Sequence, residues 1–214
     1  MISEMFAHGF IQRAFIGGVL VSLCAALLGV SLVLKRYSMI GDGLSHVSFG
    51  ALSIAIAFGF APIKFSIPIV IIAAFFLLRL AENGKMKSDA AIAMVSASSL
   101  AIGVIVTSLT TGLSTDVCSY MFGSILAMSK DDVIFSVVLS VVVLIMFGFC
   151  YHRIFAVTFD ESFSKATGMK VGMYNTLISI FTAVTVVLGI KMMGAMLISS
   201  LIIFPALTSM RVFK

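Results

Sequence analysis

Long apolar stretches, separated by short polar or charged segments, set the pattern of this chain. The stretches cover residues 14–34, 43–60, 62–78, 90–109, 133–151, 171–190 and 193–210. A helix needs about 20 mostly apolar residues to cross a bilayer, so these lengths predict membrane-spanning helices. The pattern predicts an all-α, polytopic helical membrane protein with about six full transmembrane helices in a single domain over residues 1–214.

One further apolar segment, residues 118–128, is too short to span a bilayer as a helix. It contains Gly123 and Ser124, which weaken a helix. We therefore expect a short re-entrant or half-helix segment, which is tolerated at membrane depth only where protein or water surrounds it.

The charged residues gather at the ends of the apolar stretches. The chain holds 14 Lys and Arg against 9 Asp and Glu, a formal net charge of +5. If residues 118–128 enter and leave on one side, the segments 35–41, 79–89, 152–170 and 211–214 share a face and hold most of the cations. That asymmetry is typical of a cytoplasmic face and puts the amino terminus outside. It does not indicate a nucleic-acid-binding groove, so no nucleic-acid partner is expected.

Composition supports a membrane location and gives no sign of an enzyme. The chain is 61% hydrophobic and 11% charged, whereas a soluble domain carries roughly 25% charged residues. No phosphate-binding loop, nucleophile elbow or HExxH element occurs. Cys24, Cys118 and Cys150 are far apart and lack zinc-finger spacing. We expect neither catalysis nor a permanently bound cofactor.

Asp42 and His46 are the candidate chemical residues. They lie four positions apart at the head of the second stretch, so a helix places them on one face. Ionisable groups in a membrane segment are expensive and are functional candidates, and an Asp oxygen with a His nitrogen suits a divalent transition metal. Alternatively, Asp42 caps the helix, Gly41 and Gly43 form a tight turn, and His46 is a hydrogen-bonded core residue. The residues alone leave both readings open.

A second candidate lies in the polar loop at 152–170. Asp160 suits a helix N-cap and Gly168 suits the residue after a helix end. Phe159, Phe163 and Ala166 fall on one face at helical spacing. This short amphipathic helix is too short to be stable alone. It needs a surface to pack on, which can be the membrane, its own bundle or a partner's groove.

Together these elements resemble the membrane permease subunits of bacterial ABC importers for zinc, manganese and iron. Five elements carry the resemblance in order: Gly41-Asp42-Gly43-Leu44-Ser45-His46, Glu82 with Asp89-Ala90-Ala91, Met121-Phe122-Gly123-Ser124, Phe159-Asp160-Glu161 through Gly168, and Gly194 through Pro205-Ala206.

The resemblance implies roles for both candidate sites. Asp42 and His46 would be metal-pathway residues for a transported zinc, manganese or iron ion. The residues that would couple the permease to the ATPase are Phe159, Asp160, Glu161, Phe163, Ala166 and Gly168.

The resemblance also implies an assembly and a location. The permease would form a homodimer in the bacterial cell (inner) membrane, in contact with membrane lipid. It would bind an ABC ATPase subunit, which hydrolyses the ATP, and an extracytoplasmic metal-binding protein.

Two departures from the family pattern stand out. Position 43 is Gly where Ala is usual, which we expect to loosen the turn that carries Asp42. Family members usually continue beyond the Pro-Ala element, so we expect this chain to lack the last C-terminal helices. An ion-coupled secondary metal transporter, or a truncated membrane protein that does not transport, remain alternative functions.

Overall fold

The structure is a computed structural model that describes residues 9–35, 37, 39–82, 88–110, 123 and 129–212. All regular elements in these residues are helices, which confirms the all-α prediction. They are α2 (Gly9–Leu34), α3 (Ile40–Ala57), α4 (Pro62–Glu82), α5 (Ser88–Leu109), α7 (Lys130–Phe159), α8 (Glu161–Ala166), α9 (Val171–Met193) and α10 (Ala195–Val212).

Six of the described helices are long and apolar enough to cross a membrane: α2, α3, α5, α7, α9 and α10. The fourth helix, α4, contains a shorter apolar stretch, Pro62–Leu77. The expectation of about six full transmembrane helices is therefore confirmed. The predicted re-entrant segment at 118–128 lies outside the described residues except for Gly123.

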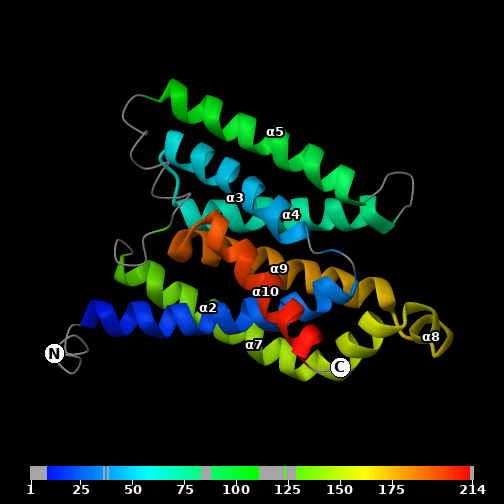
Figure 1. The fold of residues 1–214 in the computed structure, drawn as a ribbon. Coiled ribbons are helices and arrows are strands. Elements are labelled where there is room, and N and C mark those ends of the chain that lie inside the picture. Colours follow the sequence, from blue (N-terminus) through cyan, green and yellow to red (C-terminus); the bar gives the residue numbers. More distant parts are fainter. Residues whose placement is uncertain are drawn as a thin grey trace.

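The helices form a bundle in which α9 and α3 are the most enclosed. Figure 1 shows α3, α4 and α5 along one side, α2 and α7 along the other, and α9 and α10 between them. Helix α3 packs against α4, α5, α9 and α10, and α2 packs against α7, α9 and α10. Residues 181–190 of α9 are all buried, as expected for a helix that is apolar on every side.

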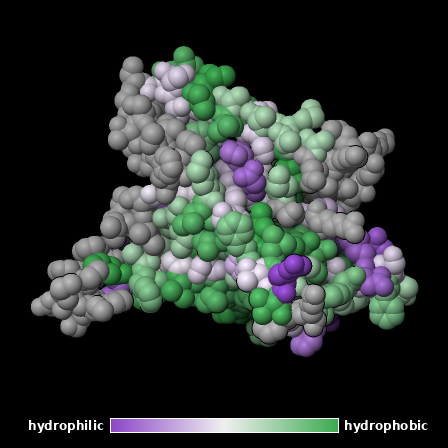
Figure 2. All heavy atoms as spheres, viewed as in Figure 1, coloured by the Kyte–Doolittle hydropathy of each residue, from purple (hydrophilic) through white to green (hydrophobic). Residues whose placement is uncertain are grey.

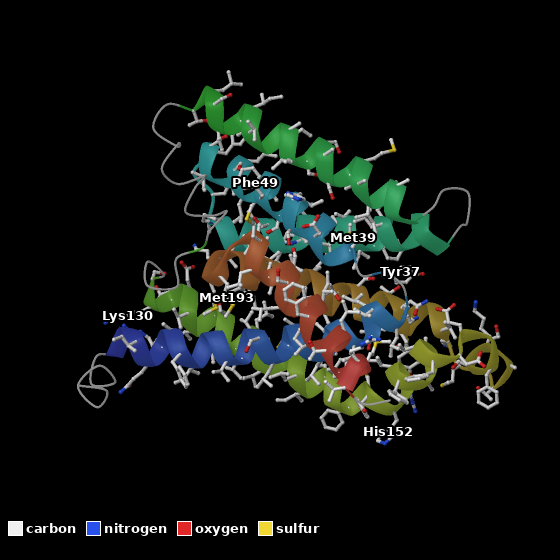
Figure 3. All side chains as sticks on the ribbon, in the orientation of Figure 1. Tyr37, Met39, Phe49, Lys130, His152 and Met193 are labelled. Carbon is white, nitrogen blue, oxygen red and sulfur yellow. The ribbon has the colours of Figure 1, made fainter. Side chains whose placement is uncertain are left out.

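Successive helices run in opposite directions, so the links between them gather at two ends of the bundle. Lys130 and Met193 lie at one end, and Tyr37 and His152 lie towards the other (Figure 3). The end of α5 and the start of α7 lie at the same end of the bundle as Lys130 and Met193 (Figure 1). The helix ends that flank the three segments assigned to the cytoplasm therefore lie together at the other end.

The side walls of the bundle suit lipid. Figure 2 shows mainly apolar residues on the face of the bundle in view, with a small hydrophilic patch over α3 and another at the α8 end. Large apolar side chains stay exposed on the outer helices, for example Ile105 and Phe149. In water such a surface would aggregate, whereas in a bilayer it needs no cover.

The structure differs from the sequence prediction at the end of α7. The stretch 133–151 was predicted to end before a loop at 152–170, but α7 continues to Phe159. Ile154 and Val157 are buried and continue the packed face of the helix. His152 and Arg153 lie on its exposed side, so their polarity does not end the helix.

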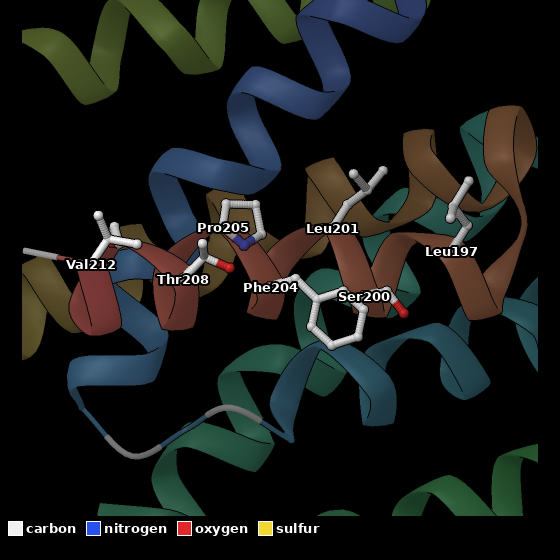
Figure 4. A pocket seen from close by; sticks show the side chains of 8 residues that line it. Leu197, Ser200, Leu201, Phe204, Pro205, Thr208 and Val212 are labelled. Carbon is white, nitrogen blue, oxygen red and sulfur yellow. The ribbon is translucent and has the colours of Figure 1, made fainter.

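Proline does not interrupt α10. A proline inside a helix removes one backbone hydrogen bond, yet helical structure continues on both sides of Pro205. An apolar groove of about 650 Å³ runs along the exposed face of this helix (Figure 4). Every residue that lines the groove belongs to α10: Leu197, Ser200, Leu201, Phe204, Pro205, Thr208, Ser209 and Val212. The groove contains no ionisable residue and lies apart from Asp42 and His46.

Candidate functional site

Asp42 lies inside the first turn of α3 and does not cap it. The cap position is Met39, which makes no side-chain capping hydrogen bond. Gly41 and Gly43 have helical backbone, so the alternative of a tight turn with an Asp cap is wrong. An acidic residue in the first turn is favoured by the positive end of the helix dipole. Helix α3 also begins inward of the nearby ends of α4 and α5 (Figure 1).

The side chains of Asp42 and His46 face one another but do not form a hydrogen bond. The His46 Nε2 and Asp42 Oδ2 atoms are 3.7 Å apart, which is too long for a hydrogen bond. The His46 side chain is 29% exposed and that of Asp42 is 48% exposed. Both side chains therefore keep polar atoms available to a third species.

The two residues open onto a cavity between α3 and α5. It has a volume of about 300 Å³. Its lining residues are Met39, Asp42, His46, Ile92, Ala93, Ser96, Ala97 and Leu100. Apart from Asp42 and His46, this wall is mostly apolar, so an ion placed there would depend on these two side chains.

Serines from neighbouring helices complete the surroundings of Asp42, and sequence analysis did not identify them. The Ser199 hydroxyl of α10 lies 3.5 Å from Asp42 Oδ1 and 3.1 Å from the Ala195 carbonyl oxygen, and either oxygen can accept its single proton. The Ser96 hydroxyl of α5 is enclosed and has no hydrogen-bond partner. A hydroxyl on an otherwise apolar span was the only sequence signal, and both stretches carry several serines.

Gly43 was expected to loosen the turn that carries Asp42. In the structure it lies within helix α3 and allows close packing. A Cβ atom at this position would lie 2.6 Å from Ile92 Cγ2 and 3.3 Å from Ser96 Oγ. Real Cβ atoms essentially never approach another atom that closely. The missing side chain therefore lets α3 approach α5 beside Asp42.

The site contains two side chains of metal-ligating type, Asp42 and His46. No group of three or more His, Cys, Asp or Glu residues that could hold a metal occurs among the residues the structure describes. Structural zinc sites use four protein ligands and catalytic ones use three. As a metal site, Asp42 and His46 would be open and would need ligands from water or from another molecule.

The second candidate region is divided between two helices. Phe159 is the last residue of α7, and its ring is 4.4 Å from that of Phe155. Asp160 caps α8 as predicted, because its Oδ1 accepts from the Phe163 amide at 2.8 Å. The side chain of Phe163 is exposed, and Gly168 has a φ of 82° just after the helix. Ala166 is also exposed.

Glu161 faces its own bundle. Its Oε1 atom accepts from Lys35 Nζ at 3.0 Å and from Asn175 Nδ2 at 2.8 Å, and Lys165 Nζ lies 3.8 Å from Oε2. Partial burial raises the pKa of Glu161, but the hydrogen bonds from Asn175 and Lys35 and the two ammonium charges outweigh it. The pKa of Glu161 therefore lies below its ordinary value.

A family model described as the ABC 3 transport family matches residues 7–214. The chain belongs to the ABC 3 transport family. This membership confirms the resemblance seen in the sequence and identifies a multi-pass bacterial membrane protein.

Relatives of this ABC 3 family protein have names that refer to metal transport. The high-affinity zinc uptake system membrane protein ZnuB of Buchnera aphidicola subsp. Acyrthosiphon pisum is 32% identical, over 91% of this chain and 75% of that protein. The manganese import system permease protein ScaB of Streptococcus gordonii is 28% identical, over 94% of this chain and 72% of that protein.

A solved structure shares the fold of this ABC 3 family protein. PsaBC from Streptococcus pneumoniae, in complex with Fab, aligns with a TM-score of 0.84 and 28% sequence identity. The alignment covers 98% of this chain and 77% of that chain. The arrangement of the described helices is therefore that of a solved structure.

Proposed function

We propose that this chain is the transmembrane permease subunit of an ABC importer that moves a divalent transition metal, zinc, manganese or iron. Asp42 and His46 hold the ion in transit. The observation that carries the proposal is a carboxylate and an imidazole on one turn of α3, open to a cavity, in an ABC 3 family chain. The names of the zinc and manganese relatives support the choice of cargo.

The spacing of the two side chains suits a shared ion. Zinc binds His nitrogen and carboxylate oxygen at about 2.0–2.2 Å, so two ligands of a tetrahedral ion lie roughly 3.4 Å apart. The observed separation is 3.7 Å, and small side-chain rotations would close the difference. An ion between them would also replace the hydrogen bond that the pair does not make.

An incomplete site is suitable for transport. Conduction requires binding that is strong enough for entry and weak enough for release. Two ligands at the positive end of α3 bind a cation more weakly than a closed four-ligand cage. We propose a homodimer in which a second copy, or water, supplies the remaining ligands.

The energy for metal transport comes from a partner chain. Helix α8 presents the exposed ring of Phe163 at the end of the bundle, and we propose that it docks in a groove of an ABC ATPase. ATP hydrolysis then belongs to that subunit, and the permease itself is not an enzyme. An extracytoplasmic metal-binding protein delivers the ion at the opposite end, and lipid covers the apolar walls.

Cellular metal content tests this function. Zinc, manganese and iron would be measured together in cells that express the chain with its ATPase and binding protein. An ATPase-dead assembly and His46→Ala are the comparisons, and membrane insertion is checked for each. We expect accumulation of one metal that needs an active ATPase and is lost in His46→Ala. Accumulation that persists with the dead ATPase would contradict an ABC importer.

A further inference from the structure

Lys35 is an almost completely buried cation where α2 ends. Its side chain is 7% exposed and its Nζ lies 3.0 Å from Glu161 Oε1. The ammonium also donates to the Asn175 side-chain oxygen, and the Asn175 amide donates to the same Glu161 oxygen at 2.8 Å. These three side chains, the Lys35 triad, connect the end of α2 with α8 and with α9.

The triad is one short link away from the proposed metal pathway. Residues 35–39 join Lys35 to α3, whose first turn carries Asp42. This link is held by backbone hydrogen bonds from Tyr37 to Leu32 at 2.8 Å and from Ile40 to Tyr37 at 3.0 Å. Tyr37 is thus hydrogen-bonded both to the end of α2 and to the start of α3.

We propose that Lys35 is a positioning residue that couples movement of α8 to the α2–α3 link and thereby to Asp42. This inference rests on the proposed function, in which α8 docks on the ATPase. A buried ion pair is often no more stabilising than apolar residues of the same volume. The pair does restrict geometry, because Lys35 and Glu161 both also contact Asn175 of α9. When α8 moves, the end of α2 moves with it.

The chain offers a matched control at the opposite end of the bundle. Lys191 Nζ of α9 and Asp132 Oδ2 of α7 are 3.1 Å apart, with side chains 16% and 33% exposed. This pair resembles Lys35 and Glu161 in length and burial. It does not touch α8 or the link to α3. Its removal should disturb the fold to a similar degree without affecting coupling.

The test measures metal transported per ATP hydrolysed in vesicles that contain the permease, its ATPase and its binding protein. The variants are Lys35→Met, which keeps a long unbranched side chain without the charge, and Glu161→Gln, which keeps a hydrogen-bonding side chain. Because coupling free energies correspond to about 5- to 150-fold, we expect the ratio to fall at least about fivefold in both. Lys35→Arg should restore most of it, and Lys191→Met should leave it within about twofold.

The result that overturns the inference is an unchanged ratio in Lys35→Met and Glu161→Gln when the wild-type assembly transports metal. An equal fall in Lys191→Met would also overturn it, because the effect would then follow from general destabilisation. Glu161→Gln keeps the test valid if Lys35→Met does not insert. Failure of the wild-type assembly to transport metal with ATP would instead refute the proposed function.

Discussion

The substitution Gly43→Ala probes how closely α3 approaches α5 beside Asp42. The new Cβ would lie 2.6 Å from Ile92 Cγ2, whereas ordinary contact begins at 3.4 Å, an overlap of about 0.8 Å. Ile92 is buried, at 3% exposed, and its β-branched side chain is stiff at χ1. Overpacking of this kind costs about 1–3 kcal/mol. Replacing Gly by Ala in a helix returns about 1 kcal/mol, so we expect a net loss of about 0–2 kcal/mol.

Removing the opposing side chain should reverse the sign. Ile92→Ala alone creates a cavity and costs about 2–5 kcal/mol. In that background the Cβ at position 43 loses the clash with Cγ2 and keeps only Ser96 Oγ at 3.3 Å and the Cβ of residue 92 at 3.8 Å as neighbours. Gly43→Ala should then stabilise the protein by up to about 1 kcal/mol. The double-mutant cycle then yields a coupling free energy of about 1–3 kcal/mol.

The assay is the free energy of unfolding of the four proteins in detergent micelles. Gly148→Ala is the control, because a Cβ there has nothing within 4 Å, and its effect should be the same with Ile92 or Ala at position 92. If Gly43→Ala has equal effects in both backgrounds, within about 0.5 kcal/mol, the close approach of α3 to α5 is refuted.

Three further predictions concern single side chains. The pKa of Glu161 is lowered by folding, so its stabilisation is complete above the ordinary carboxyl pKa and is lost as pH falls through the folded-state value. Unfolding temperatures measured from pH 7 to pH 3 should therefore fall less in Glu161→Gln. Ser96→Ala removes an unpaired hydroxyl, so it should leave the free energy of unfolding equal or higher. Because Ser96 lines the cavity with Asp42 and His46, the same change should weaken metal uptake. Ser48→Ala, also unpaired but outside the cavity wall, should leave uptake unchanged. Phe163→Asp should abolish co-purification of the ATPase, and Phe58→Asp, whose ring is exposed in the turn after α3 and outside the spans, should not.

The existence of the helices could be predicted because a bilayer requires long apolar stretches. Their ends could not be predicted as well, since a helix ends where backbone hydrogen bonding and packing end. At Arg153 the charge lies on the exposed side of α7 while Ile154 continues the packed face. At Asp42 the helix starts two residues earlier, at Ile40, without a side-chain cap.

The site was predictable where neighbours in sequence make it and not where tertiary packing makes it. Helical spacing placed Asp42 and His46 on one face, and the structure brings them to 3.7 Å. Ser199 and Ser96 come from α10 and α5, and no local pattern separates them from other serines. Glu161 was grouped with ATPase contacts because it lies in the same short segment. Its partner Lys35 is 126 positions away, so its inward direction was not visible in sequence.

The most direct test of the central claim is the nitrogen hyperfine coupling of a manganese ion bound to the reconstituted wild-type assembly. Electron spin resonance detects a ligating imidazole through this coupling. We expect the signal in the wild type, its loss in His46→Gln, and its retention in His152→Gln, because His152 is exposed on α7. The same coupling in wild type and His46→Gln would contradict the assignment of His46 to the metal pathway.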